Sequence, residues 1–258
     1  MNILYTGARS GIARSVIERI KMKENVTIYI AVHTEEQLKS VTSYYQKDKN
    51  ITCFKIDITN PKDYKKIENL DIDVTIHNAA VGYGGSLLEI PMEKLKENYE
   101  TNVFGTVSFI QYLFQKQRKG RIIIMASLAG VLPLPFLGSY CSTKSSLIMI
   151  GKVLQLETKL LEEKVDVVLI EPGLYHTGFN QVMLENKYPD MEHETYFENQ
   201  LAWLRTAEGK LFLRLEKQQM DSIAKQIEKA IFSKKPKKIY RAPMSQVLAA
   251  KLYELFCW

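Results

Sequence analysis

A tyrosine and a lysine stand four residues apart, at Tyr140 and Lys144, in the polar stretch SYCSTKSS. On a helix, residues at this spacing lie on one face, one turn apart. A phenol has an ordinary pKa of about 10, and a neighbouring ammonium group favours its charged form. The pair therefore suits proton transfer with an electrostatic partner, although the same spacing also occurs on ordinary exposed helices.

A second candidate group follows the first apolar run of the chain, in the turn TGARSGIA. Gly7 and Gly11 fit a tight strand-to-helix turn with exposed backbone. The helix that begins at Gly11 offers free N–H groups and a positive dipole end to a pyrophosphate. Two glycines alone are a weak signal, but after the first strand of a parallel sheet they favour a nucleotide.

The elements that must position these residues alternate along the chain. Apolar runs predict strands at 2–6, 26–32, 51–56, 73–78, 121–127 and 165–172, with a short one at 238–242. Helical patterns occupy 11–23, 35–47, 61–69, 91–118, 138–163 and 221–232. Several strands are nearly continuous in Ile and Val, as strands covered on both faces must be. The pattern predicts an α/β fold with a single domain over 1–258, a Rossmann-type doubly wound parallel sheet of about seven strands flanked by helices on both faces.

The alternation breaks after Gly173. Residues 174–215 are polar, aromatic and irregular in pattern, and we expect an insertion that covers the substrate. Near the end, residues 247–256 carry apolar side chains at helical spacing. This last segment fits packing within the chain, on a partner subunit or on a membrane surface, and the sequence does not separate the three.

Composition limits the class of protein. The 258 residues are 46% hydrophobic, enough to bury a proper core, and no apolar run approaches the ~20 residues that a membrane span needs. The formal charge is +6, with one dense lysine cluster, SKKPKK, read as a solvated turn, so no nucleic acid is expected. Three cysteines, far apart, argue against a disulfide framework or a metal site. We expect a cytoplasmic protein.

These motifs together resemble the short-chain dehydrogenase/reductase family, in its single-domain branch with a TGxxxGxG turn and a YxxxK pair. Thr6, Gly7 and Gly11 match the turn, and Ala13 stands where the family usually has a third glycine. The resemblance covers about 1–180 well and the whole chain in outline. It implies an NAD(P)-dependent oxidoreductase acting on CH–OH groups.

The resemblance also implies a catalytic set, which occurs here in the family's order. Tyr140 would be the acid/base, and Lys144 would lower its pKa and hydrogen-bond the nicotinamide ribose. Ser127, 13 residues before Tyr140, would hold the substrate oxygen. Asn102, in ETNVFGT, would hold a water that links Lys144 to solvent.

A dinucleotide site follows from the same resemblance. Asp57 is expected to meet the adenine, and Thr177 the carboxamide. The expected cofactor contacts are Thr6, Gly7, Arg9, Ser10, Gly11, Ile12, His33, Asp57, Ile58, Asn78, Ala79, Ala80, Tyr140, Lys144, Pro172, Gly173 and Thr177.

The end of the second strand bears on the choice of cofactor. An acidic residue there would repel a 2′-phosphate, but Val32 stands in that place and His33 follows it. Arg9 is a further candidate for a 2′-phosphate, whereas Glu35 and Glu36 are read as the start of a helix. We therefore expect NADP, with NAD as the alternative.

The substrate side is expected from 82–88, 128–136 and 174–215, with Leu128, Leu134, Tyr175 and Phe179 as candidate contacts. Such a pocket suits a bulky hydrophobic ketone or secondary alcohol of steroid, lipid or natural-product type. One alternative is a 3-oxoacyl-carrier-protein reductase, which predicts a basic docking patch at the mouth of the site. Another is a non-catalytic dinucleotide-binding sensor or scaffold, a class that usually lacks the tyrosine or lysine. Family members are commonly homodimers or homotetramers through the two long helices, here 91–118 and 138–163.

Overall fold

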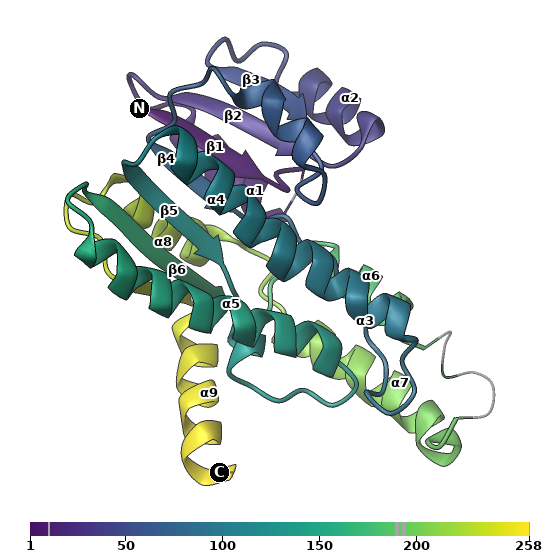
Figure 1. The fold of residues 1–258 in the computed structure, drawn as a ribbon. Coiled ribbons are helices and arrows are strands. Elements are labelled where there is room, and N and C mark those ends of the chain that lie inside the picture. Colours follow the sequence, from purple (N-terminus) through teal and green to yellow (C-terminus); the bar gives the residue numbers. More distant parts are fainter. Residues whose placement is uncertain (10, 189–190, 192–194, 258) are drawn as a thin grey trace.

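The computed structural model describes residues 1–9, 11–188, 191 and 195–257. Seven parallel strands form one sheet in the order β3-β2-β1-β4-β5-β6-β7 (Figure 1). The strands are β1 (Asn2–Thr6), β2 (Thr27–Val32), β3 (Ile51–Lys55), β4 (Val74–His77), β5 (Gly120–Met125), β6 (Val165–Pro172) and β7 (Ile239–Ala242). The predicted doubly wound sheet is confirmed, because each strand lies within one or two residues of its expected bounds.

Helices connect the strands and cover both faces of the sheet (Figure 1). They are α1 (Gly11–Ile20), α2 (Glu35–Tyr44), α3 (Met92–Tyr99), α4 (Thr106–Lys116), α5 (Gly138–Glu157), α6 (Phe179–Glu185), α7 (Glu198–Leu215), α8 (Asp221–Phe232) and α9 (Met244–Cys257). The helix expected at 61–69 is a 3-10 helix over Pro61–Ile67, capped by Asn60. None of the helices in the described ranges combines the length and the apolar character needed to cross a bilayer.

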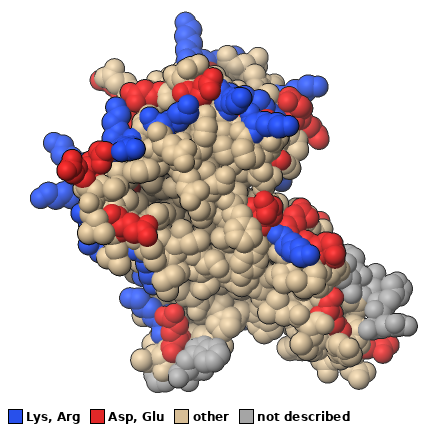
Figure 2. Space-filling view, in the orientation of Figure 1, with Lys and Arg blue, Asp and Glu red and all other residues tan. Residues whose placement is uncertain are grey.

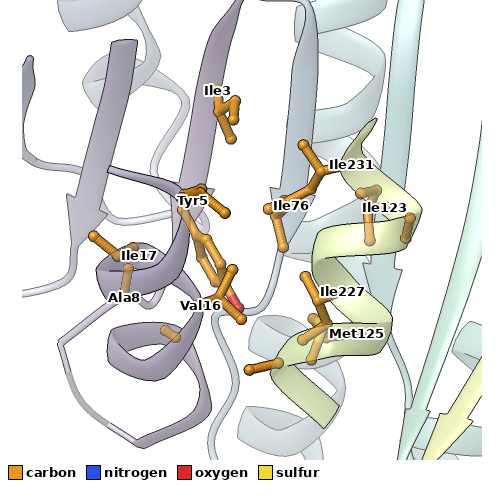
Figure 3. Packing of buried hydrophobic residues seen from close by; sticks show 14 of the residues in the cluster. Ile3, Tyr5, Ala8, Val16, Ile17, Ile76, Ile123, Met125, Ile227 and Ile231 are labelled. Atoms are coloured by element: carbon orange, nitrogen blue, oxygen red, sulfur yellow. The ribbon is translucent and has the colours of Figure 1, made fainter. Parts of the chain in front are cut away.

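The largest core cluster joins the two ends of the chain (Figure 3). One face of the central strands contributes Ile3, Tyr5, Ile76, Ile123 and Met125, all buried. These side chains pack against Val16 and Ile17 of α1 and against Ile227 and Ile231 of α8, which are all buried as well. Leu4, Ile124 and Leu169 belong to two further clusters on the opposite face, with residues of α4 and α5. The sheet is therefore buried on both sides, which explains its Ile- and Val-rich strands.

The chain reverses direction across the sheet between β1 and β4. From β1 it runs outward through β2 to β3, and from β4 it runs the other way to β7. Loops at the carboxyl ends of β1 and β4 therefore diverge and leave a crevice, the usual ligand site of such sheets.

Two segments differ from the sequence-based expectation. The helix expected over 91–118 is divided into α3 and α4 by a π-helical segment at Glu100–Gly105. A Cβ on Gly105 would lie 3.1 Å from the Ile58 carbonyl oxygen, so this stretch packs unusually close to the loop after β3. Residues 174–215, expected to be irregular, contain α6 and α7. The stretch 198–215 is rich in Leu, Ala, Glu, Lys and Arg, whose helix propensity outweighs the scattered aromatic residues.

Charge is unevenly distributed over the surface. Figure 2 shows few charged side chains on the front, over α4 and α5. Phe104, Met149, Val153 and Leu156 are exposed in this part of the chain. Assembly through these helices remains a prediction.

Candidate active site

One cleft of about 1130 Å³ opens at the carboxyl ends of the central strands. Most of the predicted site residues line it: Gly7, Arg9, Ile12, His33, Asp57, Ile58, Asn78, Ala79, Ala80, Ser127, Leu134, Tyr140, Lys144, Pro172, Gly173, Tyr175, Thr177 and Phe179. Four do not: Thr6, Gly11, Asn102 and Leu128. Leu128 is 5% exposed, and its contact with a substrate stays a prediction. Ser10 lies outside the described residues.

Tyr140 and Ser127 meet at the centre of this cleft. Ser127 caps a short 3-10 helix after β5, and its hydroxyl accepts a hydrogen bond from Ala129 N at 3.1 Å. The same hydroxyl donates to the Pro172 carbonyl oxygen at 3.4 Å and lies near the Tyr140 phenol. Burial raises the pKa of Tyr140 above its ordinary value, the nearby Cys141 acts in the same direction, and the neighbouring Ser127 hydroxyl opposes them. At neutral pH Tyr140 is therefore protonated.

Lys144 lies one turn further along α5 and is 4% exposed. Its Nζ donates to the Met125 carbonyl oxygen at 3.0 Å and lies 5.6 Å from the centroid of the Tyr140 ring. Burial lowers the pKa of Lys144 to about 8. The expected lowering of the Tyr140 pKa by Lys144 is not found in this structure, because removal from water dominates at both groups.

Asn102 acts below the cleft rather than in its wall. It is fully buried in the π-helical segment, and its amide pairs with the backbone of Val81, accepting from N at 2.8 Å and donating to O at 2.9 Å. Its Nδ2 also donates to Thr143 Oγ1 at 3.1 Å, and Thr143 donates to the Tyr140 carbonyl at 2.7 Å. Asn102 thereby connects the loop after β4 to the helix that carries Tyr140.

The glycine turn brings the chain close to the loop after β4. Gly7 has φ +63°, and a Cβ there would lie 2.6 Å from the Ala79 Cα. Asn78 Nδ2 donates to the carbonyl oxygens of Thr6 and Gly7 at 3.2 and 3.0 Å. Thr6 Oγ1 accepts from the backbone N–H groups of Asn78 and Ala79. Asn78 and Thr6 therefore fasten the turn to β4, and the first turn of α1 faces the cleft.

The rim of the cleft beside β2 carries a histidine and no acidic residue from that strand. His33 Nε2 lies 3.4 Å from Asp57 Oδ2, and both residues line the cleft. Burial acts to raise the pKa of Asp57, but hydrogen bonds from Thr59 and the nearby His33 hold it below its ordinary value. Glu35 and Glu36 lie in the first turn of α2, behind the Thr34 cap, and do not line the cleft.

Comparison with known proteins identifies the class. The family model for short chain dehydrogenases matches residues 1–187. The chain belongs to the short-chain dehydrogenase/reductase family. It is therefore an oxidoreductase of the NAD(P)-dependent kind that acts on CH–OH and carbonyl groups, as the resemblance implied.

Two relatives and one solved structure show how far the likeness extends. The NADPH-dependent 3-dehydrocapnine reductase of Ornithobacterium rhinotracheale is 28% identical over 97% of this chain and 91% of its own length. The 3-ketodihydrosphingosine reductase of Bacteroides thetaiotaomicron is 27% identical over 69% of this chain and 65% of its own length. A short-chain dehydrogenase/reductase from Burkholderia phymatum, solved in complex with NAD, superposes with a TM-score of 0.79. It is 20% identical, and the match covers 98% of this chain and 92% of that one.

The residues of this short-chain dehydrogenase/reductase fit a dinucleotide. Gly7 and Gly11 are left-handed and have no room for a side chain, since a Cβ would lie 2.6 Å from Ala79 Cα at Gly7 and 2.8 Å from Thr177 Cβ at Gly11, so the turn stays open backbone. Thr177 therefore packs directly against the start of α1, beside the N–H groups that would receive a pyrophosphate. Asp57 and Ile58 line the far end, where the family places the adenine.

Three positioning residues were missed in the sequence. Asn98 is fully buried, accepts from Tyr83 N at 3.1 Å and donates to Tyr83 O at 3.0 Å. Ser139 also donates to Tyr83 O, and Thr143 links Asn102 to Tyr140 as described above. Asn98 and Asn102 stand four residues apart in ENYETN, so both amides lie on one face of a helix. This repeat was the signal in the sequence that could have indicated Asn98.

The part of the cleft where we expect the substrate is mainly apolar. The Phe179 ring centroid lies 5.6 Å from that of Tyr140, and Leu134, Leu137, Met183 and Phe212 also line the cleft. The lining continues outward along α3 past Leu95, Tyr99 and Met92. Tyr175 reaches the cleft, but its hydroxyl is paired with Ser222 Oγ at 2.7 Å.

Proposed function

We propose that this chain is an NADP-dependent reductase of bulky hydrophobic ketones, with Asn102, Ser127, Tyr140 and Lys144 as its functional set. The grouping of Ser127, Tyr140 and Lys144 in one cleft at the switch point of the sheet carries the proposal. A bound nicotinamide would supply the hydride that reduces the substrate carbon. The remaining chemistry is the delivery of one proton to the substrate oxygen.

Tyr140 delivers that proton. Its raised pKa keeps the phenol protonated at neutral pH, and the neighbouring Ser127 hydroxyl provides a second donor for an oxygen that gains negative charge. After transfer the phenolate lies beside the Lys144 ammonium, 5.6 Å from the ring centroid to Nζ, which stabilises the charged form. Asn102 holds α5 in place through Thr143 and is a positioning residue.

The rim beside β2 supports NADP. Arg9, His33 and Gln37 line the cleft there, and the two glutamates of α2 do not. A guanidinium suits a phosphate better than it suits a bare ribose hydroxyl. NAD is the alternative cofactor.

The apolar lining and the named activities of relatives support a lipid-like ketone. The relatives include reductases of 3-dehydrocapnine and 3-ketodihydrosphingosine. The alternative of a 3-oxoacyl-carrier-protein reductase needs a basic mouth. Lys96 in the cleft lining is accompanied by Glu97 and Glu100, which favours the first reading over this alternative.

The test is oxidation of NADPH followed by absorbance, with long-chain 3-ketones, steroid ketones and a 3-oxoacyl thioester as substrates. Tyr140→Phe should lower turnover by about 10²–10⁴-fold, because phenylalanine has no hydroxyl proton to donate to the substrate oxygen. Binding of NADPH, measured by fluorescence, should hardly change. Full turnover in this variant would refute the role of Tyr140.

Arg9→Ala tests the cofactor. NADPH should bind at least about tenfold more weakly, because a charge-assisted bond to the 2′-phosphate is lost. NADH, which lacks that phosphate, should bind with nearly the wild-type Kd and serves as the control. Equal weakening of both cofactors would contradict the assignment of Arg9.

A further inference from the structure

Helix α6 lies directly on the loop that follows β4, because that loop has glycines at the points of contact. A Cβ on Gly82 would lie 2.9 Å from Phe179 Cζ and 3.3 Å from Met183 Cγ. A Cβ on Gly84 would lie 3.1 Å from both Cβ and Cγ of Lys187. Phe179, Met183 and Lys187 recur every four residues, so they share one face of α6 and of the turn that continues it. This face rests on the backbone of the loop, with no side chain between them.

The Phe179 side chain bridges the cleft beside the proposed proton donor. One edge of its ring faces Gly82, and its centroid lies 5.6 Å from that of the Tyr140 ring, at an interplanar angle of 48°. Centroid separations of about 4.5–7 Å are those of aromatic rings in contact. Gly82, Tyr140 and Phe179 all line the cleft. The ring therefore joins the loop after β4 to the helix that carries Tyr140.

The Phe179 ring has little room on the side of the loop. Met183 is 3% exposed and reaches the same position above Gly82, so it closes the space along α6. Both side chains belong to one apolar cluster. The free volume next to the ring is that of the cleft, which Tyr140 borders. A group added at Gly82 would therefore displace the ring toward Tyr140, where it would take up room that a ketone needs.

We propose that Gly82 and Phe179 together set the size limit for the ketone substituent that lies next to Tyr140. The missing side chain at Gly82 lets the ring lie back against the loop, and the ring is the wall against which this substituent packs. The other substituent leaves along the apolar lining of α3, past Leu95 and Met92. The site then selects ketones with one small substituent and one long one. This inference rests on the proposed function, because it assigns the limit to the same cleft.

Binding of two matched ketones tests the proposal without turnover. Hexyl methyl ketone and hexyl tert-butyl ketone share one chain and differ only in the bulk on the other side of the carbonyl. Each is titrated by calorimetry into the full chain in the presence of excess NADP⁺, the cofactor form that cannot donate a hydride. The wild type should bind the methyl ketone at least about tenfold more tightly, as expected when added methyl groups exceed a pocket.

Phe179→Ala removes the wall and should reverse the effect of bulk. The tert-butyl ketone should bind at least about tenfold more tightly to this variant than to the wild type, because the space of the ring becomes free. The methyl ketone already fits and should gain much less. The ratio of the two Kd values is the readout, because a general loss of structure would weaken both ketones together.

Gly82→Ala tests the other member of the pair. Its methyl group should displace the ring and weaken binding of the methyl ketone at least about tenfold. In Gly82→Ala/Phe179→Ala the same methyl group should have almost no effect on the Kd, because the ring that it would displace is absent. Gly209→Ala is the matched control: a Cβ on Gly209 would meet nothing within 4 Å, and this residue of α7 does not line the cleft. It should bind both ketones like the wild type.

Four results would each overturn the proposal. They are equal Kd values of the two ketones in the wild type, an unchanged ratio in Phe179→Ala, the same effect of Gly82→Ala with and without the Phe179 ring, and binding of neither ketone to the wild type or to Phe179→Ala. Oxidation of NADPH with the same ketones separates this failure from that of the proposed function. The binding pattern without turnover would refute the reductase activity alone, whereas turnover without the pattern would refute the size limit alone.

Discussion

Burial decides the protonation of the two central side chains. Tyr140 holds its proton more tightly than a free phenol, and Lys144 releases its proton near pH 8. A buried ammonium loses hydration that the hydrogen bond from Lys144 Nζ to the Met125 carbonyl oxygen only partly replaces. The protein therefore keeps Lys144 in a costly state that a negative charge nearby would relieve.

The lowered pKa of Lys144 predicts how the free energy of unfolding changes with pH. Lys144 has an ordinary pKa of about 10.4 when unfolded and a pKa of about 8 when folded. Between pH 8 and 10 the unfolded chain binds a proton that the folded chain has released, so stability rises with pH. Relative to Lys144→Met, the wild type should gain about 1.4 kcal/mol per pH unit in this window.

Denaturant unfolding of both proteins at several pH values measures the difference. Lys152→Met, an exposed lysine on the same helix, is the control and should show no such trend. A pH-independent difference between the wild type and Lys144→Met would mean that Lys144 keeps its ordinary pKa.

At the scale of elements, one buried carboxylate holds the segment 174–215, the expected substrate insertion, to the fold. Glu216 follows α7, and its carboxylate accepts hydrogen bonds from the side-chain amides of Asn180, at 2.8 Å, and Gln181. The same carboxylate lies 2.8 Å from His176 Nδ1. An isolated bridge between Tyr175 and Lys217 lies beside this cluster. The beginning and end of the insertion are thus tied together at the rim of the cleft.

Glu216→Ala should loosen this insertion without disturbing the dinucleotide side. Three donors lose their acceptor, so we expect the substrate KM to rise about tenfold and the cofactor Kd to stay nearly constant. Hydrogen exchange should become faster in α6. Glu185→Ala, at an exposed glutamate of α6, is the matched control. Unchanged exchange in Glu216→Ala would show that the cluster does not hold the insertion.

At the scale of the whole molecule, stability rests on the core that joins α1 and α8 to the sheet. Tyr5 is at its centre, fully buried, and no described group bonds to its hydroxyl. Tyr64, in contrast, donates its hydroxyl to the Ile58 carbonyl oxygen.

Tyr5→Phe should therefore stabilise the protein by about 1 kcal/mol, because a buried unpaired hydroxyl is removed at little change in volume. The Tm should rise by about 2–4 °C in a thermal melt. Tyr64→Phe removes a hydroxyl that is paired and should lower the Tm. A lower Tm for Tyr5→Phe would mean that the Tyr5 hydroxyl has a partner in solution.

The family and the seven-stranded parallel sheet could be predicted from the sequence, because both rest on local signals. Runs of Ile and Val, the TGARSGIA turn and the Tyr140–Lys144 spacing depend on neighbours in the chain. The order of the sheet then follows from the handedness of its connections. Ser127 and Asn102 were proposed from the family resemblance that these motifs carry, and their roles remain predictions.

Only the tertiary structure decided how these residues meet. The π-helical segment, the clamp from Asn102 through Thr143 to Tyr140, and the closing of the insertion by Glu216 join parts that are distant in sequence. The pKa of Lys144 likewise depends on how completely β5 and its own helix exclude water. The projection of α9 belongs to this class too, since the pattern of its leucines predicts a helix but not whether anything covers it. Burial is a property of the whole fold, so spacing along the chain cannot supply it.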